Sequence, residues 1–136
     1  MTALVVDTSA VMAVLLREGD APLFAGALSD ASELRMAAPT WLETAMVATA
    51  RCVGDGYREL VDFLDFVGID VVPVDLALAR LAYDGWVRYG KGRHPAGLNY
   101  GDCFSYALAK QRGEPLLFKG ADFALTDLQP AIQTDA

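Results

Sequence analysis

The sequence predicts an α/β fold, with a central and mostly parallel sheet of four to five strands flanked by helices. Short apolar runs, of the kind that form strands buried on both faces, alternate with longer stretches that carry apolar residues at helical spacing. The chain has 136 residues, of which 54% are hydrophobic and 21% charged. This length and composition suit one domain with a sizeable core. We therefore expect residues 1–136 to form a single domain.

Each element is expected where its local pattern favours it. The strands are predicted at 3–6, 34–38, 69–74 and 116–118, with a possible edge strand at 131–133. The helices are predicted at 10–16, 22–31, 41–53, 57–67, 76–89 and 100–112. Ser9, Asp20, Asp75 and Asn99 are the expected helix caps, and Gly113 ends the last helix. Right-handed crossovers then place the carboxyl ends of the strands on one edge of the sheet, where ligands bind in such folds.

Charge and composition exclude several classes of protein. Eleven basic residues against eighteen acidic ones give a net charge of −7, which excludes a protein that coats nucleic acid through a broad basic surface. The apolar runs are all shorter than the roughly 18 residues that span a bilayer, and we expect no signal peptide. Cys52 and Cys103 fall within helical patterns, which favours two reduced, packed thiols. These features predict a cytoplasmic protein with no membrane partner.

Four carboxylates each stand at the end of a strand or the start of a helix. Asp7 follows the first strand, Glu43 and Asp102 lie in the first turns of two helices, and Asp122 follows the last clear strand. Each also has a purely structural interpretation: Glu43 matches a capping box with Thr40, and the three aspartates could cap helices or start turns. Taken singly, each residue favours that interpretation. Their common position on one edge of the sheet favours a functional site.

The electrostatics of such a cluster indicate what it binds. Two carboxylates about 6 Å apart at an effective dielectric of about 20 repel by roughly 3 kcal/mol. This is large beside a domain stability of about 5–15 kcal/mol, so the cluster has to spread out, take up protons or bind a cation. Oxygen donors suit Mg²⁺ or Mn²⁺ better than Zn²⁺, and the sole histidine, His94, has no second His or Cys motif beside it. Such a site suits chemistry at phosphorus.

A basic loop precedes the helix that carries Asp102. Arg88, Lys91 and Arg93 add three positive charges within six positions of an acidic chain. The position of the loop favours phosphate binding, whereas its composition alone fits a solvated turn equally well. Three aromatic residues flank it: Trp86, Tyr89 and Tyr100. Aromatic side chains there could stack on bases, although aromatics at helical spacing more often belong to a core.

These segments resemble the PIN domain, and within it the VapC toxins of type II toxin–antitoxin systems. The resemblance covers nearly the whole chain. It is carried by Val-Val-Asp-Thr-Ser at 5–9, by Glu43, by Gly-Lys-Gly-Arg-His-Pro-Ala-Gly-Leu-Asn-Tyr-Gly-Asp-Cys-Phe at 90–104 and by Leu-Leu-Phe-Lys-Gly-Ala-Asp-Phe at 116–123. The long match at 90–104 is the most specific. Many relatives have Asn just before the last acid, where this chain has Ala121; that substitution leaves the charge of Asp122 in place.

The resemblance implies a toxic, metal-dependent endoribonuclease that cleaves structured RNA and forms a homodimer. It implies inhibition by a small VapB-like antitoxin whose C-terminal segment covers the acidic groove. It also implies Mg²⁺ or Mn²⁺ held by four residues that are also catalytic: Asp7, Glu43, Asp102 and Asp122. We expect Asp7 and Asp102 to hold the principal metal and a metal-activated water to attack the phosphodiester. The predicted substrate-binding residues are Arg88, Lys91, Arg93 and Thr8, with Asp127 and Ser9 as possible accessory residues.

Two other classes remain open at this point. A receiver-like phosphoacceptor domain also has acids at strand ends, Mg²⁺ and a lysine near the last strand, which Lys119 could supply. It needs an acceptor aspartate after a central strand, and Asp75 is the one candidate. In a non-catalytic protein-interaction module, the acids would be helix caps around a docking groove. Phosphorylation by a small phosphodonor would favour the first class, and indifference to Mg²⁺ or Mn²⁺ the second.

Overall fold

A four-stranded parallel sheet forms the centre of the molecule and confirms the predicted α/β class. The structure is a computed structural model that describes residues 2–132. The strands are β1 (Ala3–Val6), β2 (Glu33–Ala37), β3 (Ile69–Val72) and β4 (Leu116–Leu117), in the order β3-β2-β1-β4. Every pairing is parallel. The carboxyl ends of all four strands therefore lie on the same edge of the sheet.

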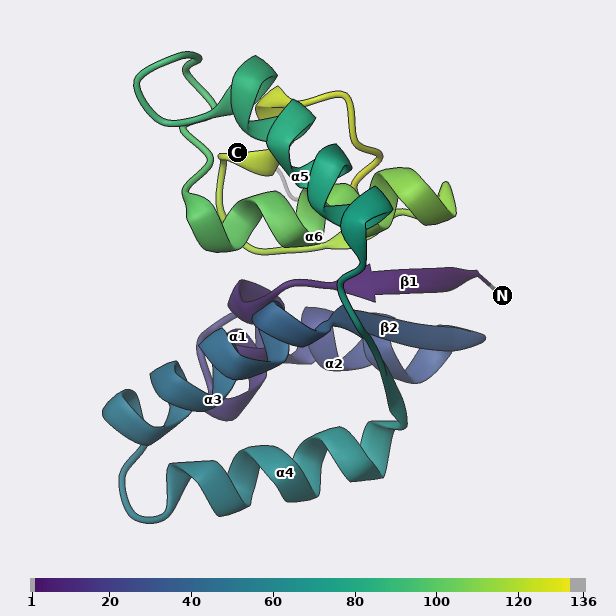
Figure 1. Ribbon diagram of the computed structural model, residues 1–136. Helices are drawn as coiled ribbons and strands as arrows, with labels where there is room; N and C mark the ends of the chain where they lie inside the picture. The colour runs from purple at the N-terminus through teal and green to yellow at the C-terminus, as the bar shows by residue number, and fades with distance from the viewer. Residues whose placement is uncertain (1, 133–136) are drawn as a thin grey trace.

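Helices cover both faces of this sheet (Figure 1). The helices of the described residues are α1 (Thr8–Leu15), α2 (Ala21–Asp30), α3 (Ala38–Arg51), α4 (Gly56–Val67), α5 (Leu76–Tyr89) and α6 (Tyr100–Arg112). Helices α1 to α4 lie below the sheet in Figure 1, and α5 and α6 lie above it. None of the helices in residues 2–132 has the length and apolar character needed to cross a bilayer.

The alternation of side chains along β1 divides the core in two. Leu4 and Val6 pack into the cluster formed with α1 to α4, whereas Val5 packs into the cluster formed with α5 and α6. Successive side chains of a strand point to opposite faces, so a central strand covered on both sides has to be apolar throughout. Val5 and Val6 are both completely buried. This burial fixes the end of β1, and with it the position of Asp7.

Several predicted helix starts need correction. Asp7, rather than Ser9, is the N-cap of α1, because its carboxylate accepts the backbone N–H of Ser9. Asp20 precedes α2 but makes no side-chain capping bond. The predicted capping box of Thr40 and Glu43 is wrong because α3 already begins at Ala38, so Thr40 lies inside the helix.

The other boundaries agree closely with the sequence prediction. Helix α6 spans the predicted residues 100–112, with Asn99 as its N-cap and Gly113 as its left-handed C-cap at φ 64°. Strand β3 ends at Val72, two residues before the predicted end. The proposed edge strand at 131–133 is reduced to a single bridge between Leu116 and Pro130. Residue 133 lies outside the described residues.

Candidate active site

Asp7 is the most deeply buried carboxylate of the site, at 4% exposure. It follows β1 directly and caps α1. Its Oδ2 accepts the backbone N–H of Ser9 at 3.0 Å and the Ser9 hydroxyl at 2.7 Å. Its Oδ1 accepts the hydroxyl of Ser105 at 2.6 Å. Both carboxylate oxygens are thus oriented by neutral donors, which leave the full negative charge in place.

Glu43 approaches the same edge from α3. Its Oε1 accepts the hydroxyl of Thr8 at 2.8 Å, and the same hydroxyl lies 2.8 Å from that of Thr44. Burial raises the pKa of Glu43, and the negative charge of Asp7 raises it further, while the hydrogen bond from Thr8 acts in the opposite direction. The Glu43 carboxylate lies against Gly101: a Cβ built there would stand 2.4 Å from Oε2. The absence of a side chain at Gly101 therefore makes room for Glu43 beside α6.

Asp102 occupies the first turn of α6 and completes a capping box with Asn99. The Asn99 side chain accepts the Asp102 N–H at 2.9 Å, and Asp102 Oδ2 accepts the Asn99 N–H at 3.0 Å. Burial raises the pKa of Asp102 to about 6, against the lowering effect of that hydrogen bond. The charges of Asp7, Glu43 and Asp122 add to the rise. All three lie within electrostatic range of Asp102, so the fold brings the four predicted carboxylates together.

Asp122 lies in the turn after β4, ahead of the short 3-10 helix Phe123–Leu125. Asp122 occupies the N-cap position and its carbonyl accepts the Leu125 N–H, but its side chain makes no capping bond. The turn is connected to Asp7 through Ser9, whose hydroxyl accepts the backbone N–H of Lys119 at 2.9 Å. Ser9 thereby links two of the elements that carry carboxylates.

The donor set fits a hard divalent cation. The four acids supply carboxylate oxygens, and their hydrogen-bond partners are hydroxyl and backbone N–H groups. Within residues 2–132, no three His, Cys, Asp or Glu side chains stand close enough together to form a metal cage. The carboxylates are therefore near enough to repel one another but are not drawn round a single point.

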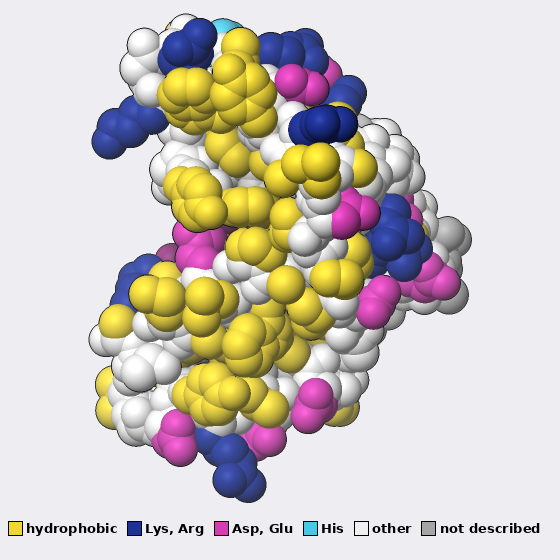
Figure 2. Space-filling model, viewed as in Figure 1, with side chains coloured by type: hydrophobic (Ala, Val, Ile, Leu, Met, Phe, Trp, Pro, Cys, Tyr) yellow, Lys and Arg dark blue, Asp and Glu magenta, His cyan; other side chains and the backbone are white. Residues whose placement is uncertain are grey.

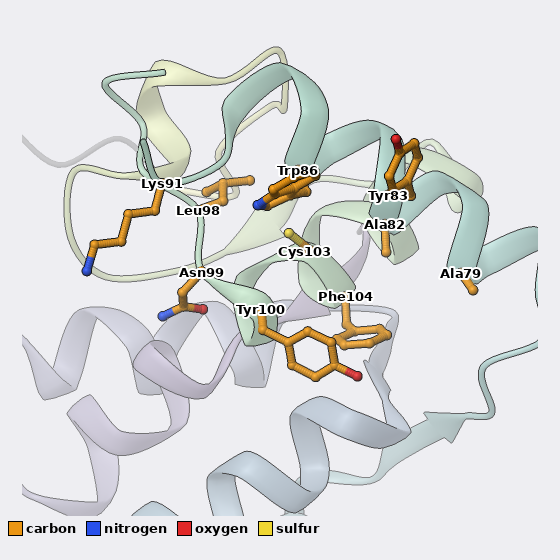
Figure 3. Close-up of a pocket in the computed structure, with 10 residues that line it drawn as sticks. All are labelled: Ala79, Ala82, Tyr83, Trp86, Lys91, Leu98, Asn99, Tyr100, Cys103 and Phe104. Carbon is orange, nitrogen blue, oxygen red and sulfur yellow. The ribbon is translucent and has the colours of Figure 1, made fainter. Parts of the chain in front are cut away.

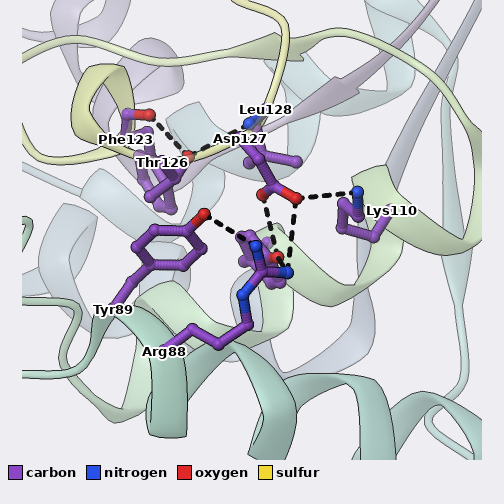
Figure 4. A network of polar contacts seen from close by, with 8 residues as sticks. Arg88, Tyr89, Lys110, Phe123, Thr126, Asp127 and Leu128 are labelled. Carbon is purple, nitrogen blue, oxygen red and sulfur yellow. Dashed lines mark hydrogen bonds and ion pairs between the residues drawn. The ribbon is translucent and has the colours of Figure 1, made fainter.

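Arg88 and Asp127 belong to a separate polar network (Figure 4). Asp127 accepts hydrogen bonds from Tyr106 at 2.9 Å and Lys110 at 2.9 Å, and pairs with Arg88 at 3.4 Å. Burial alone would raise the pKa of Asp127, but these hydrogen bonds and the two positive charges outweigh it, and the pKa is lowered. The structure thus binds Arg88 and Asp127 to each other. The arrangement favours a structural role for both residues over the roles expected from the sequence.

The remaining residues of the basic loop have different surroundings. Arg93 places its guanidinium 4.8 Å from the centre of the Trp86 ring. His94 accepts the backbone N–H of Ala96 through Nδ1 and packs edge-on against Tyr89. Lys91 is exposed and lines a cavity beside the start of α6. His94 therefore helps to shape the loop, and Lys91 is free to contact a ligand.

Ser105 is the residue that the sequence prediction missed. It is 1% exposed and follows Asp102 by three positions, about one turn of α6. Residues three apart share a helix face, so the spacing from Asp102 could have indicated it. The position of Asp7 opposite that face could not be read from local patterns.

The family model of the PIN domain matches residues 4–128 of this chain. The chain belongs to the PIN-domain family. Among curated PIN-domain relatives, "Ribonuclease VapC" of Mycolicibacterium smegmatis is 51% identical over 125 residues, which cover 92% of this chain and 97% of that protein. "Ribonuclease VapC30" of Mycobacterium tuberculosis is 50% identical over 126 residues, covering 92% and 95%.

Solved PIN-domain structures share the fold at low sequence identity. The sarcin–ricin loop-cleaving toxin VapC20 of Mycobacterium tuberculosis has a TM-score of 0.74 at 16% identity, covering 92% of this chain and 95% of that one. A toxin–antitoxin complex from Klebsiella pneumoniae gives 0.71 at 16% identity and 96% coverage of both chains.

The receiver-like alternative loses its acceptor, because Asp75 caps α5 by accepting the Leu78 N–H at 2.9 Å.

Proposed function

We propose that this PIN-domain chain is a toxic endoribonuclease of the VapC kind, which cleaves RNA phosphodiester bonds and is neutralised by a cognate antitoxin. The observation that carries the proposal is the meeting of three acids beside the start of α6: Ser105 donates to Asp7, the Glu43 carboxylate lies against Gly101, and Asp102 is the next residue. The curated relatives named as ribonucleases match nearly the full chain and support the same activity. The proposed extent of the domain is residues 1–136.

We propose that Asp7, Glu43, Asp102 and Asp122 hold Mg²⁺ or Mn²⁺. A divalent cation at such a site lowers the pKa of water and offsets the charge that develops on the phosphoryl oxygens. The chain's own contribution is orientation: Ser9 and Ser105 fix Asp7, and Thr8 fixes Glu43. Glu43, oriented by Thr8, is suited to accept a proton from the attacking water. As the water oxygen bonds to phosphorus, the bond to the leaving ribose oxygen breaks, and that oxygen takes up a proton from solvent.

Substrate binding is assigned to the positive side chains that remain free and to the polar edge of the site. Lys91, Arg93 and Thr8 are the proposed contacts, with Ser9 as an accessory residue. Arg88 is also proposed as a contact, although it is partly held by Asp127, which it shares with Lys110. With a net charge of −7, the protein repels RNA at long range, so local positive charge and a bound cation have to supply the attraction. We expect RNA affinity to fall with increasing salt.

The test measures cleavage of a structured RNA with Mg²⁺ or Mn²⁺, with EDTA, and with two variants. Asp7→Asn and Asp102→Asn are expected to remove cleavage, as is EDTA. Asp65→Asn is the matched control, because Asp65 is an exposed acid of α4 away from the sheet edge. Unchanged cleavage by the two variants would refute the mechanism. A folded protein whose stability ignores both metals would favour the interaction module instead.

We further propose that the chain acts in the cytoplasm, forms a homodimer and binds a small VapB-like antitoxin. Exposed hydrophobic side chains gather over the α3–α4 part of the face seen in Figure 2. Leu42 and Met46 of α3 are each more than half exposed. Apolar exposure of this extent is typical of protein interfaces. Light scattering of the isolated protein tests the dimer, and co-expression with its antitoxin tests inhibition.

A further inference from the structure

An aromatic cavity of about 610 Å³ lies between α5 and the start of α6 (Figure 3). Tyr83 and Trp86 line it from α5, and Tyr100 and Phe104 line it from α6. The rings form two pairs: Tyr83 and Trp86 have centroids 6.0 Å apart, and Tyr100 and Phe104 meet edge to face at 5.1 Å. Three of the four are substantially exposed, with Tyr100 at 80%, Tyr83 at 62% and Trp86 at 40%. Such exposure costs free energy in water unless a ligand covers the rings.

The cavity adjoins the carboxylates. Tyr100 and Phe104 also line a second cavity, of about 590 Å³, which contains Glu43 and Gly101. A group held among the aromatic rings would therefore be separated from Glu43 only by the Tyr100 and Phe104 side chains that the two cavities share.

Positive charge stands at the rim of this cavity. Lys91 lines it, and Arg93 lies over the Trp86 ring, held there by a hydrogen bond from its Nε to the carbonyl of Val87 at 3.1 Å. Gly90 packs against the edge of Trp86 so closely that a Cβ would stand 2.5 Å from the ring. The indole is thus packed against Gly90 and lies under the Arg93 guanidinium. Aromatic faces combined with cations are the usual means of binding single-stranded nucleic acid.

We infer that this cavity binds a nucleobase of the RNA, next to the phosphate that is cleaved. The inference rests on the proposed ribonuclease function and adds a base-binding subsite to it. A purely aliphatic groove would favour a protein segment, but four aromatic rings and Lys91 line this cavity, and Glu43, one of the acids proposed to hold the metal ion, lines the neighbouring one. Stacking tolerates any base, so the cavity selects for an unpaired nucleotide rather than for a sequence.

The first test uses the two tryptophans of the chain. Trp41 packs edge-on against Tyr57 at 6.3 Å and does not line the aromatic cavity. In Trp41→Phe, the remaining Trp86 is expected to lose fluorescence when a short single-stranded RNA analogue with uncleavable internucleotide linkages is added in Mg²⁺, where it is bound but not cleaved. In the matched variant Trp86→Phe, Trp41 is expected to show no change. An abasic ribose-phosphate oligomer should leave both variants unchanged, because it offers phosphate without a base.

The second test is kinetic. Tyr83→Ala and Trp86→Ala are expected to raise KM for RNA about tenfold with little change in kcat, since stacking holds substrate without taking part in bond cleavage. Phe66→Ala is the control, because Phe66 is an aromatic residue that is 88% exposed on α4. Tyr83→Ala removes an exposed ring, so it keeps the test valid if Trp86→Ala fails to fold.

The outcomes separate this inference from the function on which it rests. If Tyr83→Ala cleaves RNA with an unchanged KM and the fluorescence of Trp86 does not respond to RNA, the base-binding subsite is overturned. The nuclease function would then remain intact. The same result with an altered oligomeric state or a lost antitoxin complex would assign the cavity to a protein partner. RNA that the unmodified protein neither binds nor cleaves would refute the ribonuclease function itself.

Discussion

Asp102→Asn is expected to stabilise the protein in metal-free buffer at neutral pH while removing its activity. The pKa of Asp102 rises from an ordinary value of 3.8 to about 6, first through burial and then through the charges of three acids. This rise is equivalent to about 3 kcal/mol of unfavourable interaction for the ionised form. Because the side chain is partly exposed, solvent screening reduces the expected gain to about 1–2 kcal/mol. Asparagine can still accept the Asn99 N–H, so the capping box survives.

The pH dependence of this stabilisation shows whether the ionised form of Asp102 causes it. In the unmodified protein, a raised pKa means that the folded state binds the proton more tightly than the unfolded state does. The stability contributed by Asp102 is therefore complete below about pH 3.8 and is lost as pH rises through about 6. The advantage of Asp102→Asn should be small at pH 3.5 and reach its full value near pH 7.

Urea unfolding followed by circular dichroism, in EDTA at several pH values, measures this difference. Glu59→Gln is the control, because Glu59 also lies in the first turn of a helix, on α4. Losing that charge should slightly destabilise the protein through the helix dipole, which is the opposite sign. An Asp102→Asn protein that is no more stable than the unmodified one at pH 7 would refute the repulsion argument.

Three further predictions follow from the same site and its surroundings. Mg²⁺ at ten times its dissociation constant should raise the free energy of unfolding by about 1.4 kcal/mol, and Asp7→Asn should abolish this shift in a thermal melt. Gly101→Ala should keep or increase the stability of α6, but it should displace the carboxylate of Glu43 and lower cleavage about 10- to 100-fold. Gly26→Ala is the control, because it has open space at its Cβ position and should leave cleavage unchanged. Asp127→Asn should lower the free energy of unfolding by about 0.5–1 kcal/mol near pH 7 without altering cleavage per folded molecule. Because the pKa of Asp127 is lowered, this difference in the free energy of unfolding should disappear as pH falls below about 3.8. A large loss of cleavage in Asp127→Asn would instead place Asp127 in the reaction.

Local sequence patterns predicted the helices and strands because each of these elements depends mainly on neighbouring residues. The alternation of strands and helices, the Asn99 cap and the Gly113 stop each depend on residues within one turn, and the structure confirms all of them. The fold class alone then indicated that Asp7 and Asp102 would meet, because parallel topology fixes which ends share an edge.

The errors arose where a distant contact replaced a local one. Thr40 and Glu43 have the spacing of a capping box, but α3 begins earlier, and Glu43 binds Thr8 instead. The pairing of Arg88 with Asp127, 39 positions away, is likewise a distant contact that local patterns did not predict. Ser105 carries no charge, and although its spacing from Asp102 places it on the same face of α6, its contact with Asp7 could not be read from local patterns.

The two halves of the core lie on opposite faces of the sheet, and the acids come from both. Glu43 is carried by α3 below the sheet and Asp102 by α6 above it, while Asp7 ends the strand between them. An ion shared by these residues would connect the two helical layers at the edge of the sheet that they have in common. Hydrogen exchange in α3 and α6 should then slow in concert as magnesium is added, even though few of the protected amides are near the ion.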